Sequence, residues 1–284
     1  MEPVHFSLIA LPVLTLLLFA LERAVPLREP KRLLVRRLIV NGCVGALAVA
    51  AAFVFVRPVA VRLVERADDF GLLSMLTVPG AVKWIIGFLL LDLSFYYWHR
   101  ANHASRILWR LHNVHHTDPD LDVSTAFRFH FAEIALSAGF RVVQIVLIGG
   151  PVSLFVVYEL VFQVQVLFQH SNVRLPFAAE RWLSWVLVTP RMHGIHHSHV
   201  REENNSNLST VFSCWDRWHR TLRLNVPQSQ VDIGIPGYSL PEDNQVTRVL
   251  LMPFRRQRDY WQTTDGVVLT RSPMPEASQA RLAM

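Results

Sequence analysis

The chain has 284 residues, of which 51% are hydrophobic and only 18% are charged, and this balance excludes an ordinary soluble globular protein. The net charge of +6 comes from Lys and Arg residues that gather beside apolar segments, which favours topogenic and lipid-headgroup charge over a nucleic-acid partner. Two cysteines, Cys43 and Cys214, are too few for a disulfide framework or a thiolate zinc site of their own.

Five apolar segments follow along the chain, and a bilayer span needs about 20 such residues. The segments are Phe6–Leu21, Ile39–Val56, Ala81–Trp98, Ile134–Ile148 and Val152–Phe168. The last two are separated by Gly149-Gly150-Pro151, which predicts a turn. Because several segments are short, we expect an all-α integral membrane protein with about four to five membrane-embedded helices.

The loop between the first two apolar segments is strongly basic. It contains Arg23, Arg28, Lys31, Arg32, Arg36 and Arg37. The positive-inside rule places this loop in the cytoplasm. Alternating the later segments across the bilayer brings every histidine-rich stretch to the same side. The sequence therefore predicts a multi-pass protein whose metal site lies on the cytosolic face.

Three short blocks hold eight of the 13 histidines: HRANH at 99–103, HNVHH at 112–116 and HGIHH at 193–197. Residues at i, i+3 and i+4 share one face of a helix, and imidazole binds first-row metal ions. Eight imidazoles are too many for one ion and suit two, and His170 is a natural ninth ligand. The predicted ligands are His99, His103, His112, His115, His116, His170, His193, His196 and His197. Lone His5 and His199 are interpreted as ordinary polar residues.

The stretches DLSFYYWHRANH, LWRLHNVHHT, FRFHFAE, FQHSNV and TPRMHGIHHS follow in the order typical of the fatty acid hydroxylase/sterol desaturase superfamily, which this chain resembles over roughly residues 85–222. NNSNLSTVFSCWDRWHRT is similar to the family's stretch after the last block. The resemblance implies a cytosolic helical cap and a non-haem di-metal site, with iron in the active form and zinc possible after purification.

The resemblance also implies an activity: O2 and two electrons are used to hydroxylate or desaturate an unactivated C–H bond of a fatty acyl, sterol or isoprenoid lipid. No catalytic residue beyond the metal centre is predicted. No fused electron-transfer domain is visible, so we expect an external donor of ferredoxin or cytochrome type. Two alternatives remain: a non-enzymatic membrane metal-binding protein (a transporter or sensor) and an inactive lipid-binding relative. Histidines gathered at one membrane face argue against transport.

The chain departs from the family pattern ahead of the last block. Fatty acid hydroxylases carry HxxxH there, but the position four before His170 is Val166. His130 is the candidate replacement, as a direct ligand or as a hydrogen-bonding partner. His219 occupies a position where relatives tend to have Phe, and is interpreted as a surface or substrate-entry residue.

Acidic residues near the blocks are candidates for orienting the ligands, since a ligating imidazole usually donates its other N–H to an acceptor. Asp92 lies two helical turns before His99 inside an apolar segment, and Glu133 and Asp216 are further candidates. The alternating acids that follow HNVHH, at positions 118, 120 and 122, predict a solvated loop.

The chain is expected to divide into three parts: N-terminal membrane helices with the basic loop (1–80), a catalytic core (81–222) and a C-terminal cytosolic extension (223–284) with a flexible tail. Aromatic residues at 95–98 and at 127, 129 and 131 predict core or interfacial packing, or the lining of a lipid channel.

Overall fold

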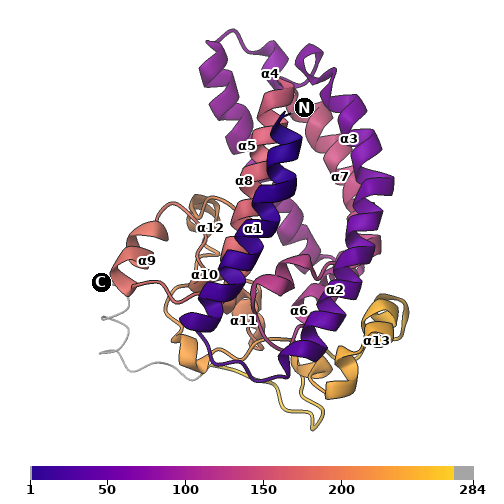
Figure 1. Ribbon diagram of the computed structural model, residues 1–284, viewed down its shortest axis with the longest axis vertical. Coiled ribbons are helices and arrows are strands. Elements are labelled where there is room, and N and C mark those ends of the chain that lie inside the picture. Colours follow the sequence, from indigo (N-terminus) through magenta and orange to yellow (C-terminus); the bar gives the residue numbers. More distant parts are fainter. Residues whose placement is uncertain (1, 272–284) are drawn as a thin grey trace.

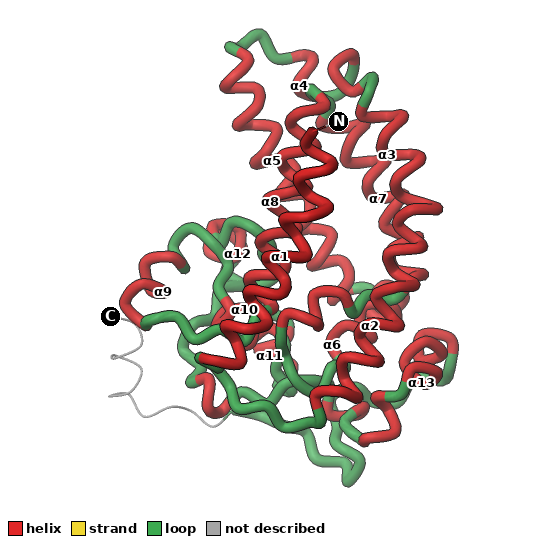
Figure 2. Tube along the Cα trace, viewed as in Figure 1, coloured by secondary structure: helices red, strands yellow, loops and turns green. Residues whose placement is uncertain are grey.

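The computed structural model describes the backbone of residues 2–271 and the side chains of residues 9–271. Within that range every regular element is a helix, and the only β-type pairings are isolated bridges (Figure 2). The all-α prediction is therefore confirmed. The side chain of His5 and the predicted flexible tail from residue 272 onward lie outside the described residues.

Long helices run side by side and form the upper part of the molecule in Figure 1. They are α1 (Glu2–Ala24), α2 (Leu34–Ala51) continued by the π-helical η1 (Ala52–Val56) and α3 (Arg57–Val64), α5 (Gly80–Ala104), α7 (Phe131–Ile148) and α8 (Val152–His170). Four stretches are long and apolar enough to cross a membrane: Leu34–Val64, Gly80–Ala104, Phe131–Ile148 and Val152–His170. The protein is thus a multi-pass membrane protein with four candidate spans.

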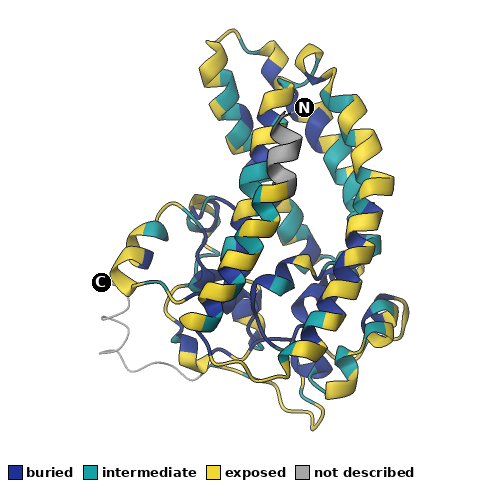
Figure 3. Ribbon diagram, in the orientation of Figure 1, coloured by how far each residue is buried: buried dark blue, intermediate teal, exposed yellow. Residues whose placement is uncertain are grey.

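The outward faces of these helices are apolar. Leu16, Ile39, Phe53 and Leu147 are all more than half exposed, and Figure 3 shows exposed residues along the outer sides of the long helices. A soluble protein rarely exposes so much contiguous apolar surface, whereas lipid-facing helices require it. The outer surface therefore supports the assignment of these helices to the bilayer.

The turn predicted between the last two spans is confirmed. Gly149 and Gly150 have φ values of 70° and 113°, which glycine adopts at little cost. A Cβ atom on Gly149 would lie 1.9 Å from the carbonyl oxygen of Phe70, so a larger residue cannot fit. The hairpin of α7 and α8 is thereby held against the loop before the short helix α4 (Leu72–Met75).

Short helices and loops form a cap at one end of the long helices (Figure 1). The cap contains α6 (Arg106–His116), η3 (Val123–Phe127), α9 (Phe177–Leu183), α10 (Pro190–His196), α11 (Arg201–Asn204), α12 (Cys214–His219) and α13 (Val246–Leu251). Part of the segment after residue 222 packs on this core, since Ile235, Tyr238 and Val249 form one buried cluster with Val40 and Trp109.

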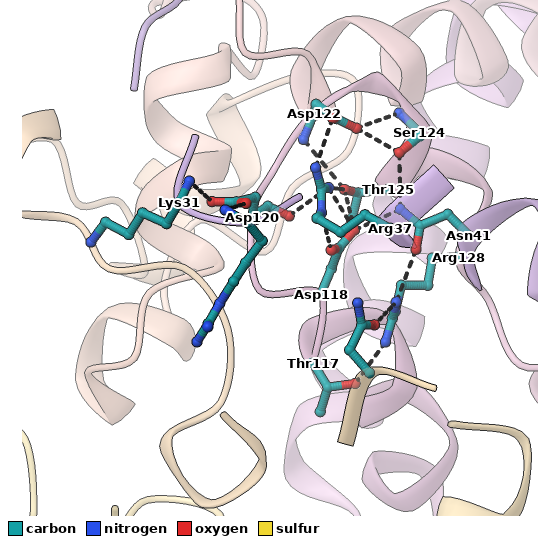
Figure 4. Close-up of polar contacts among 12 residues, drawn as sticks. Lys31, Arg37, Asn41, Thr117, Asp118, Asp120, Asp122, Ser124, Thr125 and Arg128 are labelled. Carbon is teal, nitrogen blue, oxygen red and sulfur yellow. Dashed lines mark hydrogen bonds and ion pairs between the residues drawn. The ribbon is translucent and has the colours of Figure 1, made fainter. Parts of the chain in front are cut away.

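The acidic run after HNVHH is buried, so the prediction of a solvated loop was wrong (Figure 4). Arg37 donates from Nε to Asp118 at 2.8 Å and from Nη1 to Asp122 at 2.9 Å. The Nη2 of Arg37 also donates to the backbone oxygen of Asp120, and Asn41 donates to Asp118. Burial is tolerated because the basic loop, some 80 residues earlier in the chain, supplies the opposite charges.

These contacts keep the two carboxylates ionised. Burial alone would raise the pKa of Asp118, but Arg37 and Arg128 outweigh it and hold the pKa below its ordinary value. Burial also opposes ionisation of Asp122, yet Arg37 and Ser124 lower its pKa to about 2. Both values are depressed in the folded chain, so this contribution to stability is present above pH about 4 and is lost as the pH falls toward 2.

Candidate metal centre

The nine histidines that the sequence predicts as ligands lie at the ends of four helices. His99 and His103 lie on the last turns of α5, His170 ends α8, HNVHH ends α6, and HGIHH ends α10 and its C-terminal cap. Because α5 packs on α6 and α8 packs on α10, these four helix ends meet in one place. Local helical periodicity therefore aligns the rings, and helix packing brings them together.

The nine rings form two groups. One contains His99, His103, His112, His116 and His196, and the other contains His115, His170, His193 and His197. Within each group one ligand atom from every residue lies within 4.8 Å of the others. Each HxxHH block serves both groups: its i, i+4 pair enters one group and its remaining histidine enters the other. The sequence predicted a shared face for each block but not this division.

The four-histidine group has the nitrogen spacing of a coordination sphere. The Nε2 of His170 lies 2.9 Å from His193 Nε2 and 3.0 Å from His115 Nε2, and the Nε2 atoms of His193 and His197 are 3.1 Å apart. Nitrogens about 2.1 Å from one ion are about 3.0 to 3.4 Å apart in octahedral or tetrahedral geometry. Hydrogen bonding cannot explain both His170 contacts, since its Nδ1–H donates to Val166 and its Nε2 has one lone pair.

In the five-histidine group, three rings are oriented by acceptors on their Nδ1 side. His99 donates to the Leu208 carbonyl, His196 to the Ser206 carbonyl and His112 to Glu133 Oε1, each at 2.8 Å. Each bond fixes the proton on Nδ1 and leaves an Nε2 lone pair for a metal ion. Glu133 thus has the orienting position that the sequence suggested for it.

Five histidine rings of the cap have a lowered pKa, which favours the neutral form that a ligand needs. Burial, followed by the neighbouring histidines, lowers the pKa of His115, His116, His193 and His197 well below the ordinary value. Burial also lowers the pKa of His196 to about 3. Within residues 9–271, no hydrogen-bond partner is found for the buried His196 Nε2. A buried lone pair without a partner costs about 1–3 kcal/mol, and a bound metal ion removes that cost. The residues therefore fit the implied metal pair.

Neither the Val166 position nor His130 supplies a ligand atom to the two groups. Val166 is buried in an apolar cluster, and its carbonyl oxygen accepts the Nδ1–H of His170 at 2.7 Å. His130 caps α7: its Nδ1 accepts from the Ala132 N–H at 3.1 Å and its Nε2 donates to the Leu250 carbonyl. The structure thus places His130 in a structural role and uses the backbone at 166 to orient His170.

Asp92 and Asp216 act on the ligands through a loop. Asp92 accepts from the backbone N–H groups of Val211 and Phe212 and, at 2.7 Å, from the indole of Trp215. Asp216 accepts from the N–H groups of residues 208 and 209. The loop that they fix presents the carbonyls that orient His99 and His196.

The remaining histidines of the described residues lie apart. His219 is half-buried, and its Nε2 lies 2.9 Å from the hydroxyl of Tyr97 while its ring stacks on Tyr96. His199 donates its backbone N–H to Asp232 and belongs to neither group. Both placements agree with the interpretation that these residues are not ligands.

A cavity of about 300 Å³ adjoins both groups. His99, His112, His115, His170 and His193 line one part of it, and Phe95, Trp98, Ala126, Phe127, Phe129 and Phe162 line much of the rest. The aromatic stretches are thus divided, because the rings at 95, 98, 127 and 129 line the cavity whereas those at 96, 97 and 131 do not. A lipid chain entering this apolar space would lie beside the histidines.

Several polar residues of this cavity are not among those that the sequence singles out, and Arg141, Glu159 and Gln163 are three of them. The sequence does contain a signal for Arg141 and Glu159, because both are charged residues inside segments apolar enough to cross a membrane. Charges in such segments are costly and mark functional positions by default.

The fold and the histidine groups define a class: a multi-pass membrane protein with two histidine groups that fit a metal site and adjoin an apolar cavity. Residues 84–221, just under half of the chain, match the fatty acid hydroxylase family. The family suggested by the ordered histidine blocks is thereby confirmed.

Curated relatives share this region. An ornithine lipid hydroxylase from Rhizobium tropici is 31% identical over 159 residues, covering 56% of this chain and 47% of the relative. Alkylglycerol monooxygenases from Homo sapiens and Xenopus tropicalis are 31% and 30% identical over 140 and 150 residues, covering 47% and 52% of this chain and 29% and 31% of the relatives. The chain therefore spans less than half the length of these relatives. No solved structure matches the chain significantly.

Replacing Glu133 by glutamine tests the orientation of His112. The neutral amide is a weaker acceptor for the Nδ1–H of His112, so metal affinity of the five-histidine group is expected to fall about 10- to 100-fold. Titration of the metal-free protein with Fe²⁺ measures this change. Glu202→Gln, an exposed change on α11, is the matched control and should leave affinity unaltered. Equal affinities of the two variants would show that Glu133 does not support the site.

Proposed function

We propose that this chain is a membrane-bound di-iron oxygenase that hydroxylates an unactivated C–H bond of a lipid. The observation that carries the proposal is the pair of largely buried imidazole groups at the end of an apolar cavity. The reaction converts the C–H bond, O2, two electrons and two protons into a C–OH bond and one water molecule. Two iron ions, one held by each group, would supply the activation of O2.

The chain's own residues contribute orientation and exclusion of water. Acceptors on the Nδ1 side hold the rings of His99, His112 and His196 in place before any metal binds. Phe95, Phe129 and the other aromatic residues of the cavity give the substrate chain an apolar surface. Exclusion of water around the site protects the oxidant from side reactions.

Hydroxylation is favoured over desaturation by the relatives. The printed names of the Rhizobium tropici and Homo sapiens proteins describe a hydroxylase and a monooxygenase, both of which insert oxygen. Hydroxylation and desaturation share the abstraction of hydrogen. The proposed substrate class is a fatty acyl, sterol or isoprenoid lipid. Desaturation is recognised in a test by the loss of two hydrogens in place of a gained oxygen.

Electrons are proposed to come from an external ferredoxin or cytochrome-type donor that docks on the cap at the cytosolic face. Trp109 supports this position, because its ring centre lies 4.9 Å from that of His103 and 5.3 Å from that of His116. Trp109 stacks on half-buried Trp261, and Arg110 donates to the backbone oxygens of Pro253 and Arg255. The exposed Arg32 and Arg36 of the basic loop support a cytosolic cap through the positive-inside rule.

Counting bound metal tests the proposed site. The purified, iron-reconstituted protein is expected to hold two ions per chain, and a strong chelator should remove both together with the activity. His199→Ala is the control because His199 lies outside both groups. One ion or none per chain would overturn the di-metal proposal. Two tightly held ions in a protein that changes no lipid would favour a metal-binding or inactive lipid-binding protein.

A further inference from the structure

A charged pair lies inside the membrane-spanning part of the protein, away from the histidines. The Nη2 of Arg141 on α7 donates to the Glu159 carboxylate on α8 at 2.8 Å. Both residues belong to candidate spans, where an unneeded charge is expensive. The pair does not touch the metal ligands, so orientation of the site does not explain it.

The pair lies where two cavities meet. Arg141, Glu159 and Gln163 line the cavity of about 300 Å³ that reaches the histidines. The same three residues line a larger, mostly apolar cavity of about 1200 Å³ between α3, α7 and α8. Ala52 and Val56 are also common to both cavities. A lipid that passes from the larger space to the histidines through this junction meets the polar group.

The group is balanced in charge and offers both donors and acceptors. Gln163 donates to the second carboxylate oxygen of Glu159 at 2.7 Å. The guanidinium of Arg141 lies over the ring of Phe95 at 4.4 Å, which holds it at the cavity wall. The side chain of Glu159 is 43% exposed and that of Arg141 is 19% exposed, so both retain free surface toward the cavities.

We propose that Arg141, Glu159 and Gln163 bind an uncharged hydroxyl or amide group of the lipid substrate. Such a group accepts from Arg141 and donates to Glu159 at the same time, without separating the pair. An anionic headgroup would meet the Glu159 carboxylate or would have to break the ion pair, and both are costly in an apolar cavity. This inference rests on the proposed function, since it names the substrate class of the same site.

The position of the group also sets where the lipid is oxidised. On α8, Gln163 lies seven residues and Glu159 eleven residues before the ligand His170. At 1.5 Å per residue the backbone positions of Gln163 and Glu159 are roughly 10 and 16 Å from that of His170 along the helix. The oxidised carbon is thus separated from the bound polar group by a stretch of chain of this length.

Three probes of equal chain length test the proposal: hexadecanamide, hexadecanoate and hexadecane. Their binding to the metal-loaded protein in nanodiscs is followed by tryptophan fluorescence, since Trp98 lines the cavity. The native protein is expected to bind hexadecanamide about 10- to 100-fold more tightly than either other probe, because a hydrogen bond to a charged group contributes about 1.5–3 kcal/mol. Equal binding of the three probes would overturn the proposal.

Glu159→Gln gives the second readout. It leaves the charge of Arg141 uncompensated, so the preference is expected to change from hexadecanamide to hexadecanoate. The doubly neutral variant R141Q/E159Q should lose the discrimination, and an unaltered preference in a folded Glu159→Gln protein would contradict the proposal. If Glu159→Gln does not fold, the proposal is tested by the Gln163→Leu variant and by the affinities of the native protein for the three probes. Metal content and lipid oxidation are measured on the same samples, so a missing preference in an active enzyme refutes only this inference.

Discussion

Replacing His193 by alanine is expected to reduce bound metal from two ions to one per chain, whereas replacing His103 leaves both ions bound. His193 belongs to the four-histidine group, where its Nε2 contacts both His170 and His197. Its loss leaves three imidazoles with a gap between them. His103 belongs to the five-histidine group, so four imidazoles remain after its removal. Its side chain is half-buried.

Metal analysis of the two variants, reconstituted side by side with iron, measures this asymmetry. Turnover of the His193→Ala variant is expected to fall by more than about a hundredfold, because a catalytic metal contributes several kcal/mol to transition-state stabilisation. The unfolding temperature of both variants is measured as a control for folding. Equal loss of metal in the two variants would contradict the division of the rings into groups of four and five.

Replacing Arg37 by leucine is expected to lower the free energy of unfolding by about 3–5 kcal/mol. The side chain of Arg37 is only 3% exposed, and its removal leaves the buried carboxylates of Asp118 and Asp122 without their main partner. The acidic run directly follows HNVHH in the sequence, so metal binding is expected to weaken as well. Denaturant unfolding in detergent measures the change.

Lys31→Leu is the matched control for Arg37→Leu. Lys31 pairs with Asp232, but the two side chains are 60% and 56% exposed, so the expected change is within about 1 kcal/mol. In a double-mutant cycle, Arg37→Leu combined with Asp118→Leu should cost less than the sum of the two single changes. An Arg37→Leu variant as stable as the Lys31→Leu control would show that the buried pair does not stabilise the fold.

The sequence was sufficient to predict the helical membrane fold and to identify the nine histidines as candidate metal ligands. The reason is local: apolar length identifies a span, and a spacing of three or four places rings on one side of a helix. The Gly149-Gly150 turn was predicted for the same reason, since only glycine tolerates its backbone. The extent of the helices was less predictable, because the segment expected over 39–56 extends through η1 and α3 to Val64.

Features that depend on distant partners could not be predicted. The acids at 118, 120 and 122 have the pattern of a solvated loop, and only the approach of Arg37 makes them a buried network. The role of position 166 differs for a local reason: the family pattern predicts a side-chain ligand there, whereas the backbone oxygen of Val166 accepts from His170 in the same helix. The Arg141–Glu159 pair was visible only as two separate charges in two apolar segments.

The most direct test of the proposed function is lipid mass spectrometry on a host grown with isotope-labelled O2, with and without the gene. One class of membrane lipid is expected to gain a single labelled oxygen atom only when the gene is present, and His193→Ala is expected to abolish the gain. A lipid complement that is identical with and without the gene, in cells that contain the metal-loaded protein, would contradict the assignment of this chain as a lipid hydroxylase.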